Sequence, residues 1–289
     1  NALLSEIPDI IIGRSGDGFQ QQDFRQLSCI FKQLLQFASF YIHLNLNVVN
    51  VVMELIIYLL IGAIAGFTAG LFGVGGGLIV VPILYIVFTQ LQYDPSVIMH
   101  MAVGTSLATI IVTSISSVMA HHLKGAVLWP VFRNLAPGLV IGSFLGAGIA
   151  DYLPGQGLQL LIGFFAVWVA LRMFSRANVK IDPASTLPST PKQMATGAGI
   201  GIASAIFGIG GGSLTVPFLN RCGVVMQKAV ATSAACGLPI AIAGALGFMW
   251  FGKQSDVTVP NTIGYIHIYA FIGISIMSCF TAKVGAKVA

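Results

Sequence analysis

The sequence predicts an all-α polytopic membrane protein made of two inverted repeats. Of its 289 residues, 56% are hydrophobic and only 8% are charged, whereas ordinary soluble domains contain about 25% charged residues. Several apolar stretches reach the length of about 18 residues that a membrane-crossing helix requires. A glycine-rich phrase also occurs twice, each time in apolar surroundings. The composition excludes a typical soluble protein, and the duplication indicates two related halves.

The repeated phrase predicts a break in a helix. It reads F-G-[VI]-G-G-G, followed by four residues and a proline, and runs from Phe72 to Pro82 and again, 135 residues later, from Phe207 to Pro217. Consecutive glycines interrupt a helix. Breaks at matching places in the two halves of a membrane transporter point to its substrate site.

The beginning of the chain differs from the rest. Residues 1–52 form an atypical N-terminal segment of mixed composition, and the apolar character begins at Met53. The hypothesis is that the natural protein begins at Met53 and that the preceding residues are not native. The alternative is that Phe37–Val52 forms a helix at the membrane interface.

Two transmembrane repeats follow. Apolar stretches lie at 53–88, 97–120, 127–150 and 156–174 in the first repeat (53–174), and at 192–220, 228–251 and 261–282 in the second (192–289), with a cytoplasmic linker at 175–191. The repeat extends beyond the glycines, since Ala102–Ser106 matches Ala229–Ser233 and Gly146–Ala150 matches Gly285–Ala289. Because 156–174 then has no counterpart, we expect the second repeat to be truncated by one helix.

The first stretch of each repeat is too long for a single crossing. As one helix, residues 53–88 would measure about 54 Å at 1.5 Å per residue, against a hydrocarbon core of about 30 Å. A re-entrant hairpin fits better, with arms near 53–72 and 78–89 and the glycines between them.

The charges of the connections favour this topology. Lys and Arg predominate at 121–133, 172–192, 221–228 and the C-terminal end, whereas 89–96, 151–155 and 252–260 are acidic or neutral. With one hairpin in each repeat, all basic connections fall on one side, which the positive-inside rule makes cytoplasmic. Each repeat is then a hairpin plus three transmembrane helices, and the second enters the membrane upside down.

The glycines are candidate anion ligands. A glycine loop that opens a helix directs several backbone N–H groups toward one point, and the helix dipole adds about half a positive charge there. Glycine has no Cβ to obstruct a ligand. The alternative is that the glycines only permit close packing of helices. The candidate substrate-binding glycines are Gly73, Gly75, Gly76, Gly77, Gly208, Gly210, Gly211 and Gly212.

Hydroxyl groups are the next candidates, because they can donate hydrogen bonds to an oxyanion without carrying a charge. Thr105 and Ser106 in the first repeat match Thr232 and Ser233 in the second, and Ser213 follows the second glycine run. Their alternative role is hydrogen bonding between helices inside the bundle.

Other functions find no support in the sequence. No carboxylate lies deep in an apolar stretch, and there is no metal-ligand cluster, Ser-His-Asp arrangement or nucleotide-binding Lys-Ser or Lys-Thr after the glycines. We expect no enzyme, catalytic residue, cofactor or metal. The net charge of +5 lies in short loops, so the expected partners are a small anionic substrate and the lipid bilayer rather than nucleic acid. Association into a homo-oligomer is a further possible partnership that the sequence does not decide.

With its doubled G-x-G-G-G-x4-P phrase and its Ala-Val-x-Thr-Ser pair, the chain resembles the sulfite exporter TauE/SafE family, also called the toluene sulfonate uptake permease family. The resemblance covers Met53–Ala289. It implies a multi-pass protein of a bacterial-type inner membrane that moves sulfur-containing anions such as sulfite or sulfonates. We therefore expect a secondary transporter of such oxyanions. An anion channel and a non-transporting intramembrane subunit of a larger complex are the alternatives.

Overall fold

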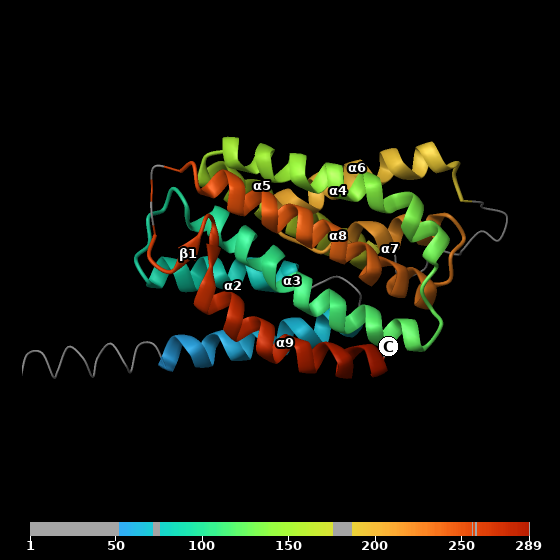
Figure 1. The fold of residues 1–289 in the computed structure, drawn as a ribbon, viewed down its shortest axis with the longest axis horizontal. Coiled ribbons are helices and arrows are strands. Elements are labelled where there is room, and N and C mark those ends of the chain that lie inside the picture. The colour runs from blue at the N-terminus through green and yellow to red at the C-terminus, as the bar shows by residue number, and fades with distance from the viewer. Residues whose placement is uncertain (1–51, 72–75, 176–186, 256, 258, 289) are drawn as a thin grey trace, which may run out of the picture. The chain divides into compact units, whose positions relative to one another are not determined.

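The computed structural model describes residues 52–71, 76–175, 187–255, 257 and 259–288 (Figure 1). The chain divides into two units, Asn1–Glu54 and Leu55–Ala289. Of the first unit only residues 52–54 are described, and they begin the helix Val52–Leu71. The second unit contains the remainder of this helix and every other described element.

The second unit is almost entirely helical. After the helix Val52–Leu71, its first half contains α2 (Gly77–Gln90), α3 (Ile98–Leu123), α4 (Trp129–Tyr152) and α5 (Gly155–Ser175). Its second half contains α6 (Thr190–Phe207), α7 (Gly212–Arg221), α8 (Met226–Gly252), β1 (Thr262–Ile263), β2 (Ile266–His267) and α9 (Ile268–Val288). Among the described residues, five helices are long and apolar enough to cross a membrane: Val52–Leu71, α3, α4, α8 and α9. The prediction of a helical membrane protein is confirmed.

One element departs from the all-α prediction. The stretch expected as a helix at 261–282 begins instead as a short antiparallel hairpin of β1 and β2, and α9 starts only at Ile268. Asn261 and Gly264 have positive φ angles of 59° and 58°. These left-handed residues turn the chain back on itself before a helix can begin.

Each stretch that was expected to be re-entrant consists of two helices separated by the glycines. In Figure 1 the helix Val52–Leu71 runs from the left toward the middle of the unit, and α2 returns to the left. In the second half α6 enters from the right, and α7 returns to the right. The starts of α2 and α7 therefore lie near the middle of the unit, far from its two ends.

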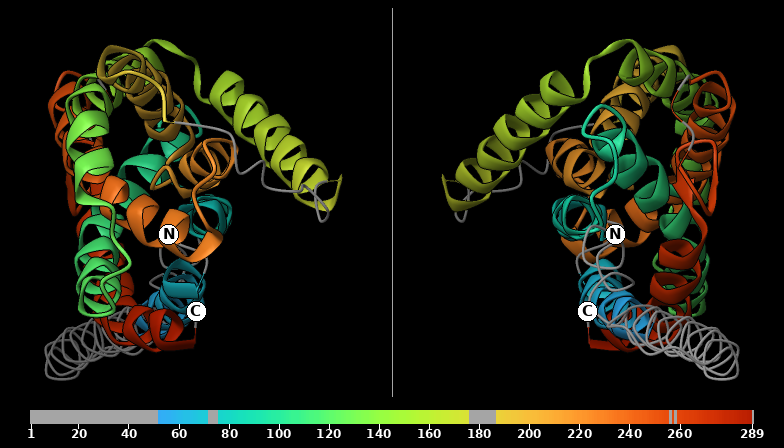
Figure 2. Two further views of the ribbon diagram at one scale, coloured as in Figure 1. Left: turned by 90° about the vertical axis from the view of Figure 1, so that its right-hand side faces the viewer. Right: turned by 90° about the vertical axis from the view of Figure 1, so that its left-hand side faces the viewer.

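The helix α5 stands apart from the other helices, as both end-on views show (Figure 2). One of its contacts is made by Phe165, whose ring stacks on that of Phe207 in α6 at a centroid distance of 3.8 Å. On its outer face Leu160 and Phe164 are each 76% exposed. Such an exposed apolar face suits contact with lipid.

Glycines join the two halves at two helix pairs. A Cβ on any of three glycines of α4 would collide with backbone carbonyl groups of α6, and three glycines of the helix Val52–Leu71 lie in the same way against α9. In each pair the two helices run parallel, and one comes from each half. Small residues of this kind let membrane helices approach closely. The six glycines are Gly138, Gly142 and Gly146, and Gly62, Gly66 and Gly70.

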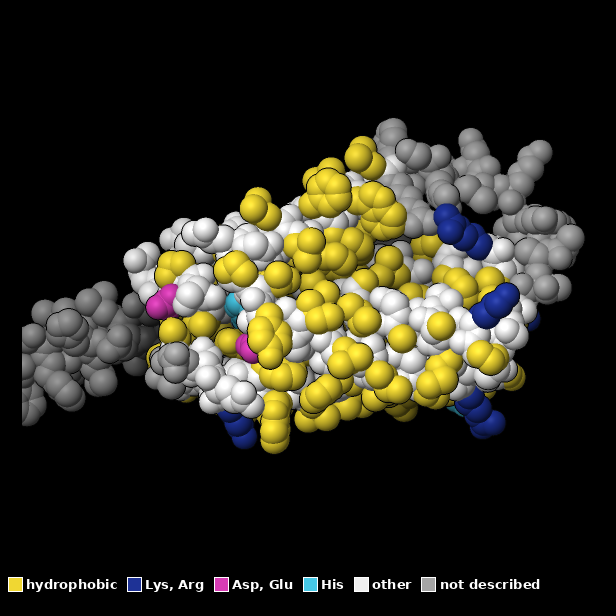
Figure 3. Space-filling model, turned by 90° about the horizontal axis from the view of Figure 1, so that it is seen from above, with side chains coloured by type: hydrophobic (Ala, Val, Ile, Leu, Met, Phe, Trp, Pro, Cys, Tyr) yellow, Lys and Arg dark blue, Asp and Glu magenta, His cyan; other side chains and the backbone are white. Residues whose placement is uncertain are grey.

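Charged side chains gather toward the ends of the unit. On the face shown in Figure 3, most Lys and Arg side chains lie toward the right and the Asp and Glu side chains toward the left. The connections at the right in Figure 1 include α3–α4, with Lys124, and α7–α8, whose following helix carries Lys228. Every Lys and Arg whose side chain is described is exposed. No described cation lies in the interior.

Candidate functional site

Glycines with the same backbone conformation cap the helices that follow the two breaks. Gly211, with a φ of 74°, caps the start of α7, and Gly76, also with a φ of 74°, caps the start of α2. Gly73 and Gly75, two of the predicted ligands, lie outside the described residues. A residue with a Cβ is strained at this φ, so glycine allows both helices to begin abruptly at the break.

The two breaks contact each other. A Cβ on Gly77, the first residue of α2, would collide with the carbonyl oxygen of Gly208 and would lie 2.9 Å from the Cα of Ile209. The start of α2 is therefore packed against the backbone that joins α6 to α7. Two helix N-termini from different halves are brought to one region in the middle of the unit.

The first backbone amides of both helices have no acceptor among the described residues. In α7, the amides of Leu214 and Thr215 donate to the carbonyl oxygen of Gly211 at 3.1 and 2.7 Å. The amides before them, and their counterparts in α2, have no such partner. Each helix start carries about half a positive charge, which favours an anion. The amides that donate to no acceptor in the described part of the chain are those of Gly77, Leu78, Gly212 and Ser213.

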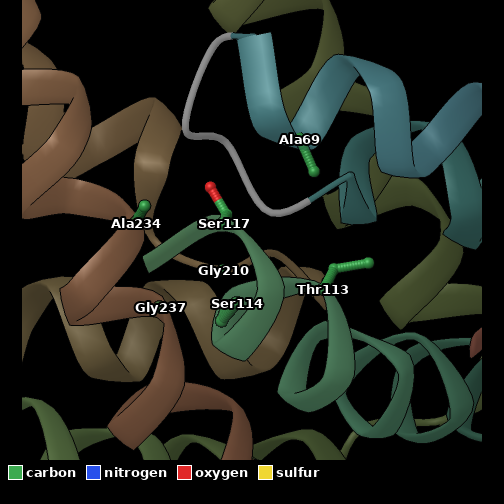
Figure 4. Close-up of a pocket in the computed structure, with 7 residues that line it drawn as sticks. All are labelled: Ala69, Thr113, Ser114, Ser117, Gly210, Ala234 and Gly237. Atoms are coloured by element: carbon green, nitrogen blue, oxygen red, sulfur yellow. The ribbon is translucent and has the colours of Figure 1, made fainter. Parts of the chain in front are cut away.

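A small cavity lies beside the second break (Figure 4). The space open to the centre of a water molecule is about 10 Å³, which is room for about one water molecule. The walls come from the helix Val52–Leu71, α3, the second break and α8, so both halves contribute to it. The lining residues are Ala69, Thr113, Ser114, Ser117, Gly210, Ala234 and Gly237, and none of them is charged.

Buried hydroxyls without partners surround this region. The Oγ of Ser117 points into the open space in Figure 4; the residue is 2% exposed, and the oxygen has no partner among the described residues. Ser204 and Thr215 are also buried and unpartnered, with oxygens 3.4 and 3.5 Å from where a Cβ on Gly211 would lie. The Oγ of Ser213 has no described partner either. An unsatisfied buried hydroxyl costs about 1–3 kcal/mol, so these groups suit a ligand with acceptor oxygens.

Comparison with known proteins identifies the family. Residues 58–289 match the family model described as sulfite exporter TauE/SafE. The chain belongs to the TauE/SafE family. A probable membrane transporter protein of Haemophilus influenzae is 36% identical over 81% of this chain and 88% of its own length. Similar proteins occur in Methanocaldococcus jannaschii, at 28% identity over 80% of this chain and 84% of the relative, and in Bacillus subtilis (YunE), at 31% over 63% and 73%. No solved structure matches the chain.

Family membership and the five long apolar helices together make this TauE/SafE protein a multi-pass protein of a bacterial-type membrane. Both of the first two relatives are named probable membrane transporter proteins. The relatives therefore support the reading of this chain as a membrane transporter.

In this TauE/SafE protein the two repeated threonines hold the starts of spanning helices. The Oγ1 of Thr105 accepts a hydrogen bond from the backbone amide of His267 at 2.9 Å, and the Oγ1 of Thr232 accepts one from the amide of Leu128 at 3.0 Å. His267 directly precedes α9, and Leu128 directly precedes α4. The two bonds thus occupy equivalent places in the two halves.

The repeated serines are also engaged. Ser106 donates its hydroxyl to the carbonyl oxygen of Gly208 at 2.8 Å, which ties α3 to the second break, and Ser233 has an interaction partner too. Neither serine, and neither repeated threonine, lines the cavity. The assignment of these four residues as substrate ligands stays a prediction.

The residues that sequence reasoning missed lie on α3 and α6. Ser114 and Ser117 line the cavity, and Ser204 lies beside the second break. A search for features shared by both repeats does not find these serines. Ser114 and Ser117 correspond to Ala241 and Gly244 in α8, and Ser204 corresponds to Ala69 in the helix Val52–Leu71. The signal that was available is the Thr-Ser-x-Ser-Ser run that begins at Thr113, inside an otherwise apolar helix.

His267 is buried at the start of α9, at the end of the unit opposite to the basic connections. The Nδ1 of His267 accepts a hydrogen bond from the amide of Ala270 at 3.2 Å, which places the ring proton on Nε2, 3.1 Å from the hydroxyl of Tyr93. Burial lowers the pKa of His267 to about 4. The ring is therefore neutral at physiological pH and serves as a cap for the start of α9.

The depressed pKa of His267 predicts a loss of stability in acid. In the unfolded chain His267 binds a proton below its ordinary pKa of about 6.5, whereas in the folded chain it binds one only below a pKa of about 4. The free energy of unfolding should fall by up to about 3 kcal/mol across this window. His267→Asn keeps an acceptor for the amide of Ala270 but cannot titrate. Thermal unfolding followed across this pH range should show a shallower loss for the variant, and equal slopes would contradict the assignment.

Proposed function

We propose that this TauE/SafE protein is a secondary transporter of small sulfur-containing oxyanions, either sulfite or an organosulfonate. The observation that carries the proposal is that the start of α2 packs against the break that opens α7, beside a small uncharged cavity that is partly lined by hydroxyl groups. The amides at both helix starts and the buried hydroxyls, which have no partner among the described residues, are all donors. An oxyanion is the ligand that accepts hydrogen bonds from all of them.

The proposal includes two inverted repeats and alternating access. Three matched features support this relation. They are the two glycine caps with a φ of 74°, the equivalent threonine hydrogen bonds ahead of α4 and α9, and the two helix pairs in which a helix of one half packs on a helix of the other, α4 on α6 and Val52–Leu71 on α9. Rocking of one half against the other around a fixed site would expose the anion to each side in turn. The basic end, with Lys124 and Lys228, would face the cytoplasm.

A binding role agrees better with the described residues than catalysis does. The described residues that line the cavity are serine, threonine, alanine and glycine, and none of their side chains is a general base. The relatives from Haemophilus influenzae and Bacillus subtilis are named probable membrane transporter proteins. An ion gradient, or the gradient of the substrate itself, would drive the movement of the anion.

The proposal is tested by the thermal stability of the detergent-purified protein in a panel of anions. Sulfite and methanesulfonate should raise the unfolding temperature selectively, while acetate and chloride should not. A ligand at about 100 times its Kd stabilises the fold by about 2.7 kcal/mol. Flux into proteoliposomes should then saturate with anion concentration, whereas linear flux would indicate a channel. No stabilisation by any anion, together with no flux, would favour the non-transporting subunit.

A further inference from the structure

The connection between α3 and α4, residues 124–128, lies at the basic end of the unit, at the right in Figure 1. Within it, the side chain of Val127 is only 8% exposed. It packs with Ala231 and Ala235 of α8 in a small cluster separate from the main core, and Val118 of α3 lies against this cluster. The connection, α3 and α8 therefore meet at one place.

This cluster adjoins the wall of the cavity on two helices. On α3, Ser117 lines the cavity, and the next residue, Val118, contacts the cluster. On α8, Ala234 lines the cavity, and the next residue, Ala235, belongs to the cluster. Ala231, the other α8 member, precedes Ala234 in a helix that starts at the basic end. The connection therefore covers the cavity on the side of the basic end.

Hydrogen bonds hold the connection near both of its ends. The Nζ of Lys124 donates to the carbonyl oxygen of Ala286 in α9 at 2.7 Å. The backbone amide of Leu128 donates to the Oγ1 of Thr232 in α8 at 3.0 Å. Between these two bonds Gly125 has a φ of 66°, and a Cβ placed on it would meet no atom within 4 Å. A residue with a permissive backbone and free space around it suits a hinge.

The corresponding connection at the opposite end of the unit is held more firmly. There the hairpin of β1 and β2 places Tyr265 and Ile266 in the main core. The hydroxyl of Tyr265 donates to Asp151 at 2.9 Å, and the amide of His267 donates to Thr105 at 2.9 Å. Tyrosine and isoleucine bury more apolar surface than the valine and alanines of the other end. The α3–α4 connection is therefore the easier of the two to displace.

We propose that the α3–α4 connection is a gate that opens the cavity toward the basic end of the unit. Gly125 is its hinge, and the hydrogen bond between Leu128 and Thr232 holds it shut. Opening withdraws Val127 from α8 together with the start of α4, while Lys124 keeps the beginning of the connection on α9. This inference rests on the proposed function, since it describes access to the same site.

The gate is tested by the rate at which a membrane-impermeant methanethiosulfonate reagent labels a cysteine placed in the cavity wall as Ala234→Cys. The cavity has room for about one water molecule, so the reagent reaches this cysteine only when the cavity opens. The experiment uses the full chain with its native cysteines replaced by alanine. These are Cys29, Cys222, Cys236 and Cys279. The reagent is applied to inverted membrane vesicles, whose outer surface is the cytoplasmic face, with no sulfur anion present.

Thr232→Val keeps the shape of the side chain but removes the acceptor that holds the gate. Labelling should become about fivefold faster, the factor that corresponds to one hydrogen bond. Val127→Ala weakens the packing of the gate without removing a hydrogen bond and should also speed labelling. Thr105→Val is the matched control, because it removes the same kind of acceptor at the opposite end. It should leave the rate in these vesicles unchanged.

Two results would overturn the inference. One is an equal labelling rate in the parent, Thr232→Val and Val127→Ala. The other is an equal acceleration by Thr105→Val, which would show a general loosening of the fold. Selective stabilisation of the parent by sulfite, with no effect of either gate variant, would overturn the inference alone. Absence of both stabilisation and flux with every anion would count against the proposed function even if the gate variants label faster.

Discussion

Substitution of Gly201 by valine is expected to abolish accumulation of the folded protein. A Cβ at this position would lie 2.5 Å from the carbonyl oxygen of Leu139 and 2.8 Å from the amide nitrogen of Ser143. Both atoms are backbone atoms of α4, so neither can rotate away as a side chain would. The helices α4 and α6 would have to separate, and we expect a loss of about 3 kcal/mol or more in the free energy of unfolding.

Gly199 supplies the matched control for this prediction. It lies in the same helix, and a Cβ placed there would find no atom within 4 Å. Gly199→Val carries the same intrinsic penalty for valine in a helix, so the difference between the two variants isolates the contact with α4. Size-exclusion chromatography of the solubilised protein should give a monodisperse peak for Gly199→Val only. Equal yields for both variants would show that α4 and α6 are not packed as described.

Substitution of Ser117 by alanine should weaken anion binding without destabilising the empty protein. The Oγ of Ser117 has no described partner and points into the cavity, so its removal breaks no hydrogen bond of the fold. A hydrogen bond to a charged ligand contributes about 1.5–3 kcal/mol, which corresponds to a loss of about tenfold or more in affinity. Thermal unfolding without ligand and calorimetric titration with methanesulfonate measure the two effects separately.

The neighbouring serine should show the opposite behaviour. Ser116 donates its hydroxyl to the carbonyl oxygen of Cys279 in α9 at 2.7 Å, and it does not line the cavity. Ser116→Ala should therefore cost about 1 kcal/mol of stability and leave the affinity for the anion unchanged. If Ser117→Ala binds as tightly as the parent, or if the two variants lose affinity equally, the cavity is not the anion site.

The helices could be predicted from the sequence because lipid imposes a simple rule on length and polarity. The break between α6 and α7 was predictable too, since consecutive glycines cannot continue a helix. The hairpin of β1 and β2 was not, because apolar β-branched residues are allowed in both strands and membrane helices. In that stretch the turn residues Asn261 and Gly264 decided the outcome.

The site itself was predicted only in part. Repetition directed attention to Thr105 and Thr232, and the structure shows why such residues recur: each holds the amide ahead of a spanning helix. Ser117 and Ser204 have no hydroxyl counterparts at the matching positions of the other half, where Gly244 and Ala69 stand, so a comparison of the two halves could not reveal them.

The packing of helices from one half on helices of the other affects the order in which the protein can assemble during synthesis. The glycine face of the helix Val52–Leu71 is covered by α9, which is translated about 200 residues later. Until then this face has only lipid to contact, and the same holds for α4 until α6 has entered the membrane. Neither half can complete its own packing during synthesis. The helix Val52–Leu71 thus completes its packing only when α9 has entered the membrane, and assembly should end with a late step that joins the two halves rather than with the sequential folding of each half.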